Sequence, residues 1–424
     1  MDVSALYNLY LECGMQVSTD TRQIGQGVMF FALKGAHFNG NQFAATALSQ
    51  GAAYAIVDEH DSDDPRIIKV ENVLETLQAL ANFHRKTLNP RVIAIGGSNG
   101  KTTTKELVVS VLSTEYRILS TKGNFNNHIG LPLTLLQLRN EDQIAVLEMG
   151  ANKAGDIIEL CKIAEPELGL LTNIGKEHLE GFGSIEGVAA AEGELFDYLF
   201  KTDGHAFVNC DDSWLKSMGA HLKLKTELGR SFSKIQDVQI TPYIQFTYLG
   251  QKVASPLMGE HNLQNIMAAI AIGAFFHINP VHIAAGIAGY SPQNNRSQWV
   301  DTANGNKVLL DAYNANPSSV EAALRTFESI PGDKILVLGD MFELGAFEAS
   351  EHQHIADLCA SMPAKQVLLV GKAFAACQNI SGHVHTYAEK ADAVTALKKA
   401  GFHGVTVLIK GSRGMKMEDL LELF

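Results

Sequence analysis

A short apolar segment that leads directly into a glycine-rich turn is the feature that constrains this chain most. Residues 92–95 read Val-Ile-Ala-Ile, and residues 96–104 read Gly-Gly-Ser-Asn-Gly-Lys-Thr-Thr-Thr. This order predicts a buried strand, a tight loop and a helix that opens at about Lys105. Loop N–H groups and the positive end of the helix would face phosphates, a lysine would add a point charge, and a threonine hydroxyl would bind Mg²⁺. The segment therefore predicts a nucleoside triphosphate site with Lys101 as its cation.

The loop departs from the general phosphate-binding pattern G-x-x-x-x-G-K-[ST]. Ile95 stands where that pattern has glycine, and the chain has a tighter G-x-x-G-K-T-T-T from Gly97 to Thr104. The alternative interpretation is a glycine-rich turn with a solvated lysine. The strand and helix expected on either side favour the phosphate site.

Length, charge and cysteine content narrow the class of protein. At 424 residues the chain is too long for one hydrophobic core and predicts two or three domains. A net charge of -12 argues against a nucleic-acid partner. No signal peptide pattern and no apolar run of ~18 residues is present. Five widely spaced cysteines indicate reduced thiols. We expect a cytoplasmic protein without membrane insertion.

Linkers and composition divide the chain into three predicted domains, 1–88, 89–295 and 296–424. The first has short strand-like segments at 28–33 and 53–57 and a helix at 73–86, and Asn89-Pro90 is a plausible linker because the residue before proline leaves the helical region. A second linker is expected at 291–297.

Alternation of strands and helices predicts the folds of the second and third domains. In the second domain we expect strands at 144–148, 168–172, 207–209 and 244–249, and helices at 156–164, 184–200 and 263–276. In the third we expect strands at 307–311, 334–338, 366–370 and 405–409, and helices at 318–327, 348–360 and 390–400. The fold class is α/β: a small mixed N-terminal domain, a central P-loop ATPase domain with a mostly parallel sheet, and a C-terminal Rossmann-like domain.

Polar residues just beyond strands are the candidates for chemistry, because ligands bind there in open α/β sheets. Glu148 ends one strand and is suited to Mg²⁺, although a helix-capping or solvated glutamate is the alternative. His178 lies in a glycine-rich loop after another strand and is a candidate for ligand or substrate contact, although a lone histidine is often structural.

Two further segments offer groups for a nucleotide. Asn262 and Asn265 share a face near the start of a buried helix and present amides suited to a purine edge, with N-capping as the alternative. Asp311 could meet ribose or metal, and Tyr313 could stack on a base. Ser318 or Ser319 would then cap the following helix.

Taken together, these strings resemble the Mur ligase family over the whole chain. The phosphate loop, the segment from Thr172 to Glu180 and the segment from Gly259 to Asn265 are typical of that family. The strings at 121–132, 313–317, 338–345 and 410–413 are more specific to the branch that ligates D-alanyl-D-alanine. The strings at 18–22 and 33–41 look like the family's site for the uridine-nucleotide end of the substrate.

The resemblance implies an ATP-dependent peptide ligase of cytoplasmic peptidoglycan precursor synthesis. ATP would phosphorylate the terminal carboxylate of UDP-MurNAc-tripeptide, and the amine of D-alanyl-D-alanine would attack the acyl phosphate. The implied cofactors are ATP and Mg²⁺, and a monomer is expected. The third residue of the peptide, lysine or diaminopimelate, is not readable from the sequence.

The resemblance also implies roles for individual residues. The ATP site would comprise Gly97, Ser98, Asn99, Gly100, Lys101, Thr102, Thr103, Asn262, Asn265, Arg296, Asp311 and Tyr313. Thr102, Glu148, His178 and Glu192 would surround metals, and Lys101, His178 and Glu192 would be catalytic. Substrate would be bound by Ser18, Thr19, Asp20, Arg22, Asn39, Asn41, Asn124, Asn126, Asn127, Asn316, Glu343 and Arg413, of which Asn316, Glu343 and Arg413 are assigned to D-alanyl-D-alanine from their place at strand ends.

One position departs from the family pattern. Family members usually carry a lysine after the histidine loop that is carbamylated by CO2 and helps bind a second Mg²⁺, whereas residues 191–194 here read Ala-Glu-Gly-Glu. We expect Glu192 to take over this role, directly or through a bridging water. The alternative is a surface helix residue and a second metal site that is weak or absent.

Two rival functions would also use parts of this sequence. The first rival is another amide ligase of the superfamily that acts on a different amino acid. A folate polyglutamate ligase is one such enzyme, but it would not be expected to carry the uridine-site strings. A regulator that binds ATP without ligation would keep Lys101 and lose Glu148, His178 and Asp311, all of which are present.

Overall fold

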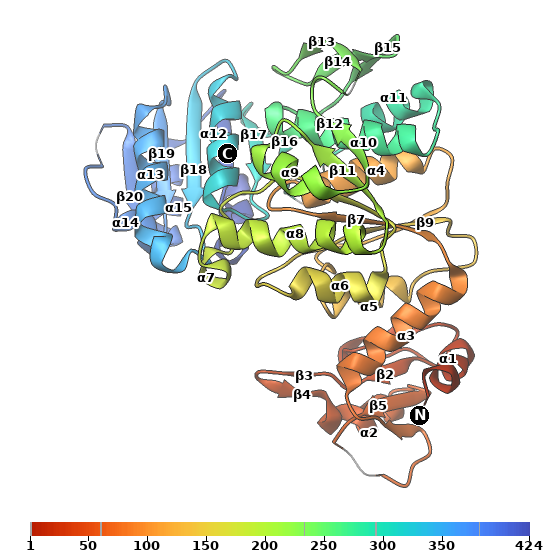
Figure 1. Cartoon of the computed structure of the whole chain (residues 1–424). Coiled ribbons are helices and arrows are strands. Elements are labelled where there is room, and N and C mark those ends of the chain that lie inside the picture. The colour runs from red at the N-terminus through yellow and green to blue at the C-terminus, as the bar shows by residue number, and fades with distance from the viewer. Residues whose placement is uncertain (1, 60–61, 233, 293–294, 381) are drawn as a thin grey trace.

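Three main sheets, one in each of three domains, organise the chain: two are parallel and the third is mostly parallel (Figure 1). The computed structural model describes residues 2–59, 62–232, 234–292, 295–380 and 382–424. The N-terminal domain lies at one end, and the central domain lies between it and the C-terminal domain. The predicted α/β class with three domains is confirmed. Within the described residues, no helix is both long and apolar enough to cross a membrane.

The N-terminal domain is built on a small parallel sheet of order β1-β2-β5-β6. Its strands are β1 (Val17–Ser18), β2 (Met29–Phe31), β5 (Tyr54–Val57) and β6 (Ile67–Lys69), with helices α1 (Val3–Glu12), α2 (Ala44–Ser49) and α3 (Val73–Leu88) and a hairpin of β3 (Lys34–Gly35) and β4 (Phe38–Asn39). Asn72 caps the start of α3 through the N–H groups of Leu74 and Glu75. Asn89, in the left-handed conformation, ends the helix before Pro90. Strand β7 follows at once.

The central domain is a fully parallel six-stranded sheet covered on both faces. Its order is β12-β11-β10-β7-β9-β8. The strands are β7 (Arg91–Gly96), β8 (Ile118–Ser120), β9 (Ile144–Glu148), β10 (Leu168–Leu171), β11 (His205–Asn209) and β12 (Leu224–Leu228). Helices α4 (Lys101–Leu112), α10 (Glu260–Phe275) and α11 (Pro280–Gly289) pack together, as do α6 (Asp156–Ala164) and α8 (Ile185–Lys201). Shorter helices are α5 (Gly130–Leu135), α7 (Leu179–Phe182) and α9 (Ser213–Met218).

Alternation along β7 explains why this strand is apolar throughout. Ile93 and Ile95 belong to the hydrophobic cluster that contains the residues of α4 and α10, whereas Val92 and Ala94 belong to the cluster that contains those of α8. Successive side chains of a strand point to opposite faces, so a strand covered on both sides reads as one continuous apolar run. Helix α8 therefore approaches the end of β7 from the face opposite α4 (Figure 1).

Two sequence expectations for this domain need correction. Helix α4 begins at Lys101 rather than near Lys105, because Gly100, with φ +83°, ends the loop and the three threonines form the first turn. The strand predicted at 244–249 exists as β14 (Gln245–Tyr248), but it pairs in a separate antiparallel sheet with β13 (Ile235–Gln239) and β15 (Gln251–Ala254).

The C-terminal domain has a six-stranded sheet of order β16-β17-β21-β18-β19-β20. Only β16 runs antiparallel to its neighbour; the strands are β16 (Gln298–Asp301), β17 (Lys307–Asp311), β18 (Lys334–Gly339), β19 (Gln366–Val370), β20 (Val384–Tyr387) and β21 (Thr406–Lys410). Its helices are α12 (Pro317–Glu328), α13 (Glu348–Ser361), α14 (Lys372–Ala375) and α15 (Lys390–Ala400). Part of the linker predicted at 291–297, residues 293–294, lies outside the described residues.

A buried histidine joins the N-terminal helices to the central domain. His84 of α3 is fully buried; its Nδ1 lies 3.0 Å from the Tyr7 hydroxyl and its Nε2 lies 3.1 Å from the Leu138 carbonyl oxygen. Because a carbonyl only accepts, Nε2 carries the hydrogen and Nδ1 accepts from Tyr7, which is the neutral tautomer. Burial lowers the pKa of His84, and Arg139 lowers it further.

We predict that His84 makes the fold sensitive to mild acid. The pKa of His84 is lower in the folded chain than in the unfolded chain, so the unfolded chain binds the proton more readily as pH falls. The contribution of His84 to the free energy of unfolding is therefore fully present above the unfolded-state pKa and is lost as pH falls toward the folded-state pKa. In His84→Gln, which can satisfy both partners without titrating, the difference in Tm between pH 7.5 and pH 5.5 should shrink by about 2 °C. Thermal unfolding at the two pH values measures it. The exposed His403→Gln is the control, and an unchanged difference in His84→Gln would contradict the assignment.

Candidate active site

Strand register brings three distant segments to one edge of the central sheet. Ile95 of β7 lies opposite Glu148 at the end of β9, and Gly96 lies opposite Leu171 at the end of β10. The glycine loop, Glu148 and the loop that follows β10 therefore leave the sheet side by side. This is the edge at which ligands bind in open parallel sheets.

The glycine loop is held on three successive backbone amides. The Gly97 N–H donates to Glu192 Oε2 at 2.6 Å, the Ser98 N–H to the Asn173 carbonyl at 2.9 Å, and the Asn99 N–H to Asn173 Oδ1 at 3.1 Å. Gly97 has a φ of +103°, and a Cβ there would lie 2.4 Å from Thr172 Oγ1. Only glycine fits this position.

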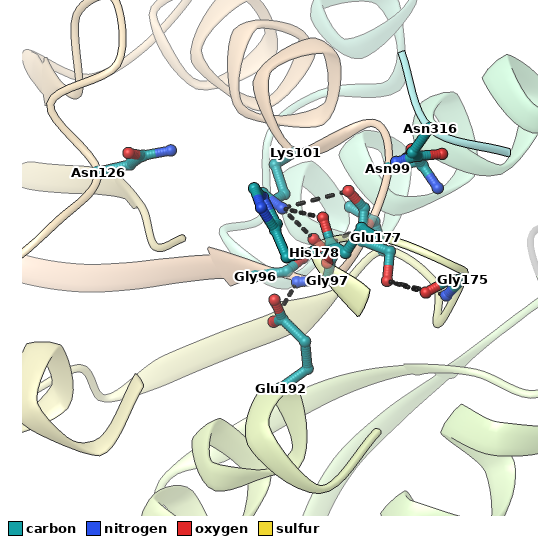
Figure 2. Close-up of polar contacts among 12 residues, drawn as sticks. Gly96, Gly97, Asn99, Lys101, Asn126, Gly175, Glu177, His178, Glu192 and Asn316 are labelled. Carbon is teal, nitrogen blue, oxygen red and sulfur yellow. Dashed lines mark hydrogen bonds and ion pairs between the residues drawn. The ribbon is translucent and has the colours of Figure 1, made fainter. Parts of the chain in front are cut away.

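Lys101 lies folded back on its own loop. Its Nζ donates to the carbonyls of Gly97 at 2.5 Å and Ser98 at 3.2 Å, and lies 3.4 Å from Glu177 Oε2 (Figure 2). Burial alone would lower the pKa of Lys101, but the carboxylates of Glu177, Glu192 and Glu148 outweigh it and raise that pKa. Lys101 is therefore charged, and its ammonium group is held by the loop carbonyls and Glu177.

Glu177 is a site residue that sequence reasoning missed. It is buried and lines the cavity beside Lys101, and its Oε1 has no hydrogen-bond partner among the described residues. Burial, with a further contribution from the Glu192 charge, raises the pKa of Glu177 to about 8 even though Lys101 opposes the shift. A single glutamate in a loop is expected to be solvated, so nothing in the local sequence indicated its burial. Its place next to His178 was the one indication that it belongs to the site.

A cavity of about 650 Å³ lies where the central and C-terminal domains meet. It is lined by most of the residues predicted for ATP, metal and peptide: Ser98, Asn99, Gly100, Lys101, Thr102, Thr103, Asn124, Asn126, Asn127, Glu148, His178, Asn262, Asn265, Arg296, Asp311, Tyr313, Asn316, Glu343 and Arg413. The structure thus brings together residues that lie up to about 300 positions apart in the sequence.

Gly97, Glu192 and the predicted residues of the N-terminal domain do not line this cavity. Glu192 is fully buried beneath the loop, so the alternative of a surface helix residue is wrong. Within the first domain, Asp20 pairs with Arg22, and Asn41 donates to Asn39 Oδ1 and Asp58 Oδ1. Ser18 bonds locally to Asp20, and Thr19 is half-buried. The residues at 18–22 bond among themselves, and those at 39–41 bond to each other and to Asp58 and Glu59.

An oxygen cluster suited to Mg²⁺ lies at the start of α4. The Thr102 hydroxyl donates to Glu148 Oε2 at 2.7 Å, and Asn126 Nδ2 donates to Glu148 Oε1 at 2.9 Å. Hydroxyl and carboxylate oxygens are the hard donors that Mg²⁺ prefers, so these residues fit the ion. Across the described ranges, no group of three or more His, Cys, Asp and Glu side chains could hold a metal. Two protein oxygens with phosphate and water are the usual complement for Mg²⁺.

His178 points toward the C-terminal domain instead of joining that cluster. Its Nδ1 lies 2.5 Å from Glu343 Oε2. Burial lowers the pKa of His178 and Lys101 lowers it further, while Glu343 opposes both. Glu343, predicted to bind peptide, thus contacts the histidine loop across the domain boundary.

Asn262 and Asn265 are linked to each other at the start of α10. Asn265 Nδ2 donates to Asn262 Oδ1 at 3.1 Å, and Asn262 Nδ2 donates to the Met258 carbonyl at 2.9 Å. Thr104 of α4 donates to Asn265 Oδ1 at 3.0 Å. The N-cap of α10 is Gly259, without a side-chain cap, so the N-capping alternative for the two asparagines is wrong.

The C-terminal domain contributes two arginines and an ion pair to the cavity. The Arg296 guanidinium lies 3.8 Å from the centre of the Tyr313 ring, and that of Arg413 lies 5.7 Å away. Arginine therefore already lies over the ring of Tyr313, which was expected to stack on a base. Asp311 bonds to Lys410 Nζ at 2.6 Å, an interaction that holds the pKa of Asp311 below its usual range despite burial.

Asn316 connects the two domains and also caps a helix. Its Oδ1 accepts from the Ser319 N–H in a capping box at the start of α12, and its Nδ2 donates to Asn99 Oδ1 at 2.9 Å (Figure 2). Ser318, expected as a possible cap, instead accepts from the Lys176 N–H at 2.9 Å. Lys176 Nζ adds an ion pair with the buried Glu351 of α13. The histidine loop is therefore fastened to the C-terminal domain at several points.

The chain matches known proteins over nearly its whole length. Family models described as "Mur ligase family, catalytic domain", "Mur ligase middle domain" and "Mur ligase, glutamate ligase domain" match residues 15–85, 95–273 and 295–413. The UDP-N-acetylmuramoyl-tripeptide–D-alanyl-D-alanine ligase of Bacillus subtilis is 38% identical over 421 residues, which cover 96% of this chain and 92% of that protein. The chain belongs to the Mur ligase family. The enzyme of the same name from Escherichia coli is 35% identical with the same coverage.

Solved structures of Mur ligases agree with the domain arrangement. The crystal structure of MurF from Acinetobacter baumannii superposes with a TM-score of 0.89 at 30% identity, covering 96% of this chain and 92% of that one. MurF ligase from Thermotoga maritima in complex with ADP superposes with a TM-score of 0.86 at 26% identity, covering 96% of each. A nucleotide thus occupies a protein of this fold.

We predict that the ion pair between Lys176 and Glu351 keeps this Mur ligase closed around the cavity. Glu351→Gln removes the charge of the buried partner of the half-exposed Lys176, so the backbone amides at 175–178 should exchange with solvent about tenfold faster. Hydrogen exchange with mass spectrometry measures the change. Glu321→Gln, which breaks the solvent-accessible pair with Arg325 on α12, is the control. Unchanged protection at 175–178 would contradict the role of the pair.

Proposed function

We propose that this Mur ligase joins the terminal carboxylate of UDP-MurNAc-tripeptide to the amine of D-alanyl-D-alanine at the expense of ATP. One observation carries the proposal: the phosphate loop, a pair of Mg²⁺-type oxygens and basic residues of the C-terminal domain line the same cavity. The names of its relatives, at up to 38% identity over nearly the whole chain, support the same substrates.

The reaction divides into two balanced steps. A carboxylate oxygen attacks the γ-phosphorus of ATP, the bond from γ-phosphorus to the bridging oxygen breaks, and ADP leaves. The amine then attacks the acyl carbon, phosphate leaves with the carboxylate oxygen, and the amine gives up a proton. Both reactants of the first step are anions, so catalysis rests on positioning and charge neutralisation.

The residues of the cavity divide this work. We propose that Lys101 and the N-terminus of α4 hold the β- and γ-phosphates, while Thr102 and Glu148 hold Mg²⁺, which neutralises phosphate charge when bound. We assign Asn262 and Asn265, which line the cavity, to the base, and Asp311 to the ribose. Arg296 and Arg413, ordered by Tyr313, would face the anionic intermediate.

The peptide and nucleotide ends of the substrate are assigned to opposite sides of the central domain. We propose that Ser18, Thr19, Asp20, Arg22, Asn39 and Asn41 bind the uridine end, and that Asn124, Asn126 and Asn127 bind the peptide near the loop. D-Alanyl-D-alanine would enter from the C-terminal domain near Glu343 and Arg413. We place the enzyme in the cytoplasm as a monomer.

Substrate dependence of phosphate release tests the proposal. Purified protein is given ATP and Mg²⁺ with UDP-MurNAc-tripeptide and D-alanyl-D-alanine, both together and singly omitted, using lysine and diaminopimelate tripeptides in parallel. We expect release only with both substrates, together with pentapeptide by mass spectrometry. Release that proceeds equally with D-alanine alone, or with no peptide acceptor, would overturn the proposal.

We predict that Thr102 and Glu148 set the Mg²⁺ requirement. Thr102→Val and Glu148→Gln each remove a hard oxygen donor while keeping side-chain volume, so the Mg²⁺ concentration for half-maximal phosphate release should rise about tenfold or more. Thr114→Val, just beyond the other end of α4, is the matched control. If both site variants keep the wild-type Mg²⁺ dependence, these oxygens do not hold the ion.

A further inference from the structure

Glu192 supports the glycine loop from beneath. It lies near the middle of α8, its side chain is fully buried, and its Oε2 accepts from the Gly97 N–H at 2.6 Å. Figure 2 shows the carboxylate rising from α8 to the junction of Gly96 and Gly97, with Lys101 above that junction. A helix on one face of the sheet thus contacts the loop that opens a helix on the other face.

The amide that Glu192 holds sits at the sharpest turn of the loop. Gly97 has a left-handed φ of +103°, and a Cβ there would lie 2.6 Å from the Thr172 nitrogen. The next two amides, of Ser98 and Asn99, bond to Asn173. Glu192 and Asn173 therefore fix three successive peptides, after which Gly100 starts α4 with its first N–H groups at the cavity.

Lys101 depends on the same turn. Its Nζ rests on the carbonyl oxygens of Gly97 and Ser98. A shift of the Gly97 peptide would therefore move both the α4 amides and the lysine. Contacts run without a gap from α8 through Glu192 and Gly97 to Lys101.

Direct contact between Glu192 and a bound group is a weaker interpretation of this geometry. Glu192 does not line the cavity, whereas Glu177 and Glu148 do. Its Oε2 is engaged by Gly97, and a Cβ on Gly96 would lie 2.9 Å from that same oxygen, so backbone packs tightly around the carboxylate. Ligation of a metal by Oε2 would require the loop to give up this hydrogen bond. The other oxygen, Oε1, is buried and has no hydrogen-bond partner among the described residues, so a role of the side-chain length must be separated from a role of the charge by experiment.

We propose that Glu192 is a positioning residue that fixes the Gly97 peptide, and through it the α4 amides and Lys101, against nucleotide phosphates. The inference rests on the proposed function only in taking a nucleotide as the ligand of the loop. In this role Glu192 accepts a hydrogen bond and does not bind a metal. The length of its side chain then matters more than its negative charge.

Two mild substitutions separate length from charge. Glu192→Gln keeps the reach and an acceptor oxygen for the Gly97 N–H but removes the charge; Glu192→Asp keeps the charge but is one methylene too short to reach. We expect Glu192→Asp to weaken ADP binding about tenfold and Glu192→Gln to stay within about threefold of wild type. Isothermal titration calorimetry with ADP, in excess Mg²⁺ and in EDTA, measures both, and the factors should be the same with and without metal.

A neighbouring carboxylate on α8 provides the matched control. Glu194 accepts from the N–H groups of Gly155 and Ile158 near the start of α6, away from the glycine loop. Glu194→Asp should therefore leave ADP affinity unchanged, while a wild-type Tm for Glu192→Asp would show that its loss of binding is local.

The opposite order of the two variants would overturn the inference. If Glu192→Asp binds ADP like wild type and Glu192→Gln weakens binding only in Mg²⁺, then Glu192 acts through its negative charge on bound Mg²⁺. ADP binding needs no peptide substrate, so failure of the ligase assay would contradict the proposed function alone. The predicted order with ADP would still support the positioning role.

Discussion

The parallel register of β7, β9 and β10 is the constraint on which the site depends. It sets the glycine loop, Glu148 and the 172–178 loop at one edge, although they are separated by up to about 80 residues in the chain. Side chains alternate along a strand, so a slip of one residue would turn Glu148 to the other face and break its contact with Thr102. The apolar residues of β7 on both faces hold this register, because each is buried against a different layer of helices.

The distribution of charge around the cavity is the second constraint on the site. Glu148, Glu177 and Glu192 surround Lys101, the cation of the glycine loop, within a protein of net charge -12. Two anionic substrates that meet there need more positive charge than Lys101 alone provides. The C-terminal domain supplies it with Arg296 and Arg413, and the contacts of Asn316, Ser318 and Glu351 hold that domain against the loops. The contacts that hold the C-terminal domain against the loops therefore also bring its arginines to the cavity.

The site residues that follow directly after apolar strands could be predicted from the sequence. The glycine loop, Glu148 and His178 could be placed because an apolar run followed by polar residues predicts a sheet edge. The start of α4 was wrong because a run of threonines has low helix propensity, which the tertiary fold overrides. The burial of Glu177 and Glu192 could not be predicted, because it depends on segments far away along the chain. The stacking of Arg296 on Tyr313 and the bond between Asn99 and Asn316 are equally nonlocal.

The central claim is that ATP activates a carboxylate at this cavity before the amine attacks. Labelling that carboxylate tests it most directly: UDP-MurNAc-tripeptide with ¹⁸O in its terminal carboxyl group is turned over with D-alanyl-D-alanine and ATP, and the released phosphate is analysed by mass spectrometry. Transfer through an acyl phosphate predicts one ¹⁸O atom in each phosphate molecule. Phosphate free of label, with pentapeptide still formed, would contradict the account.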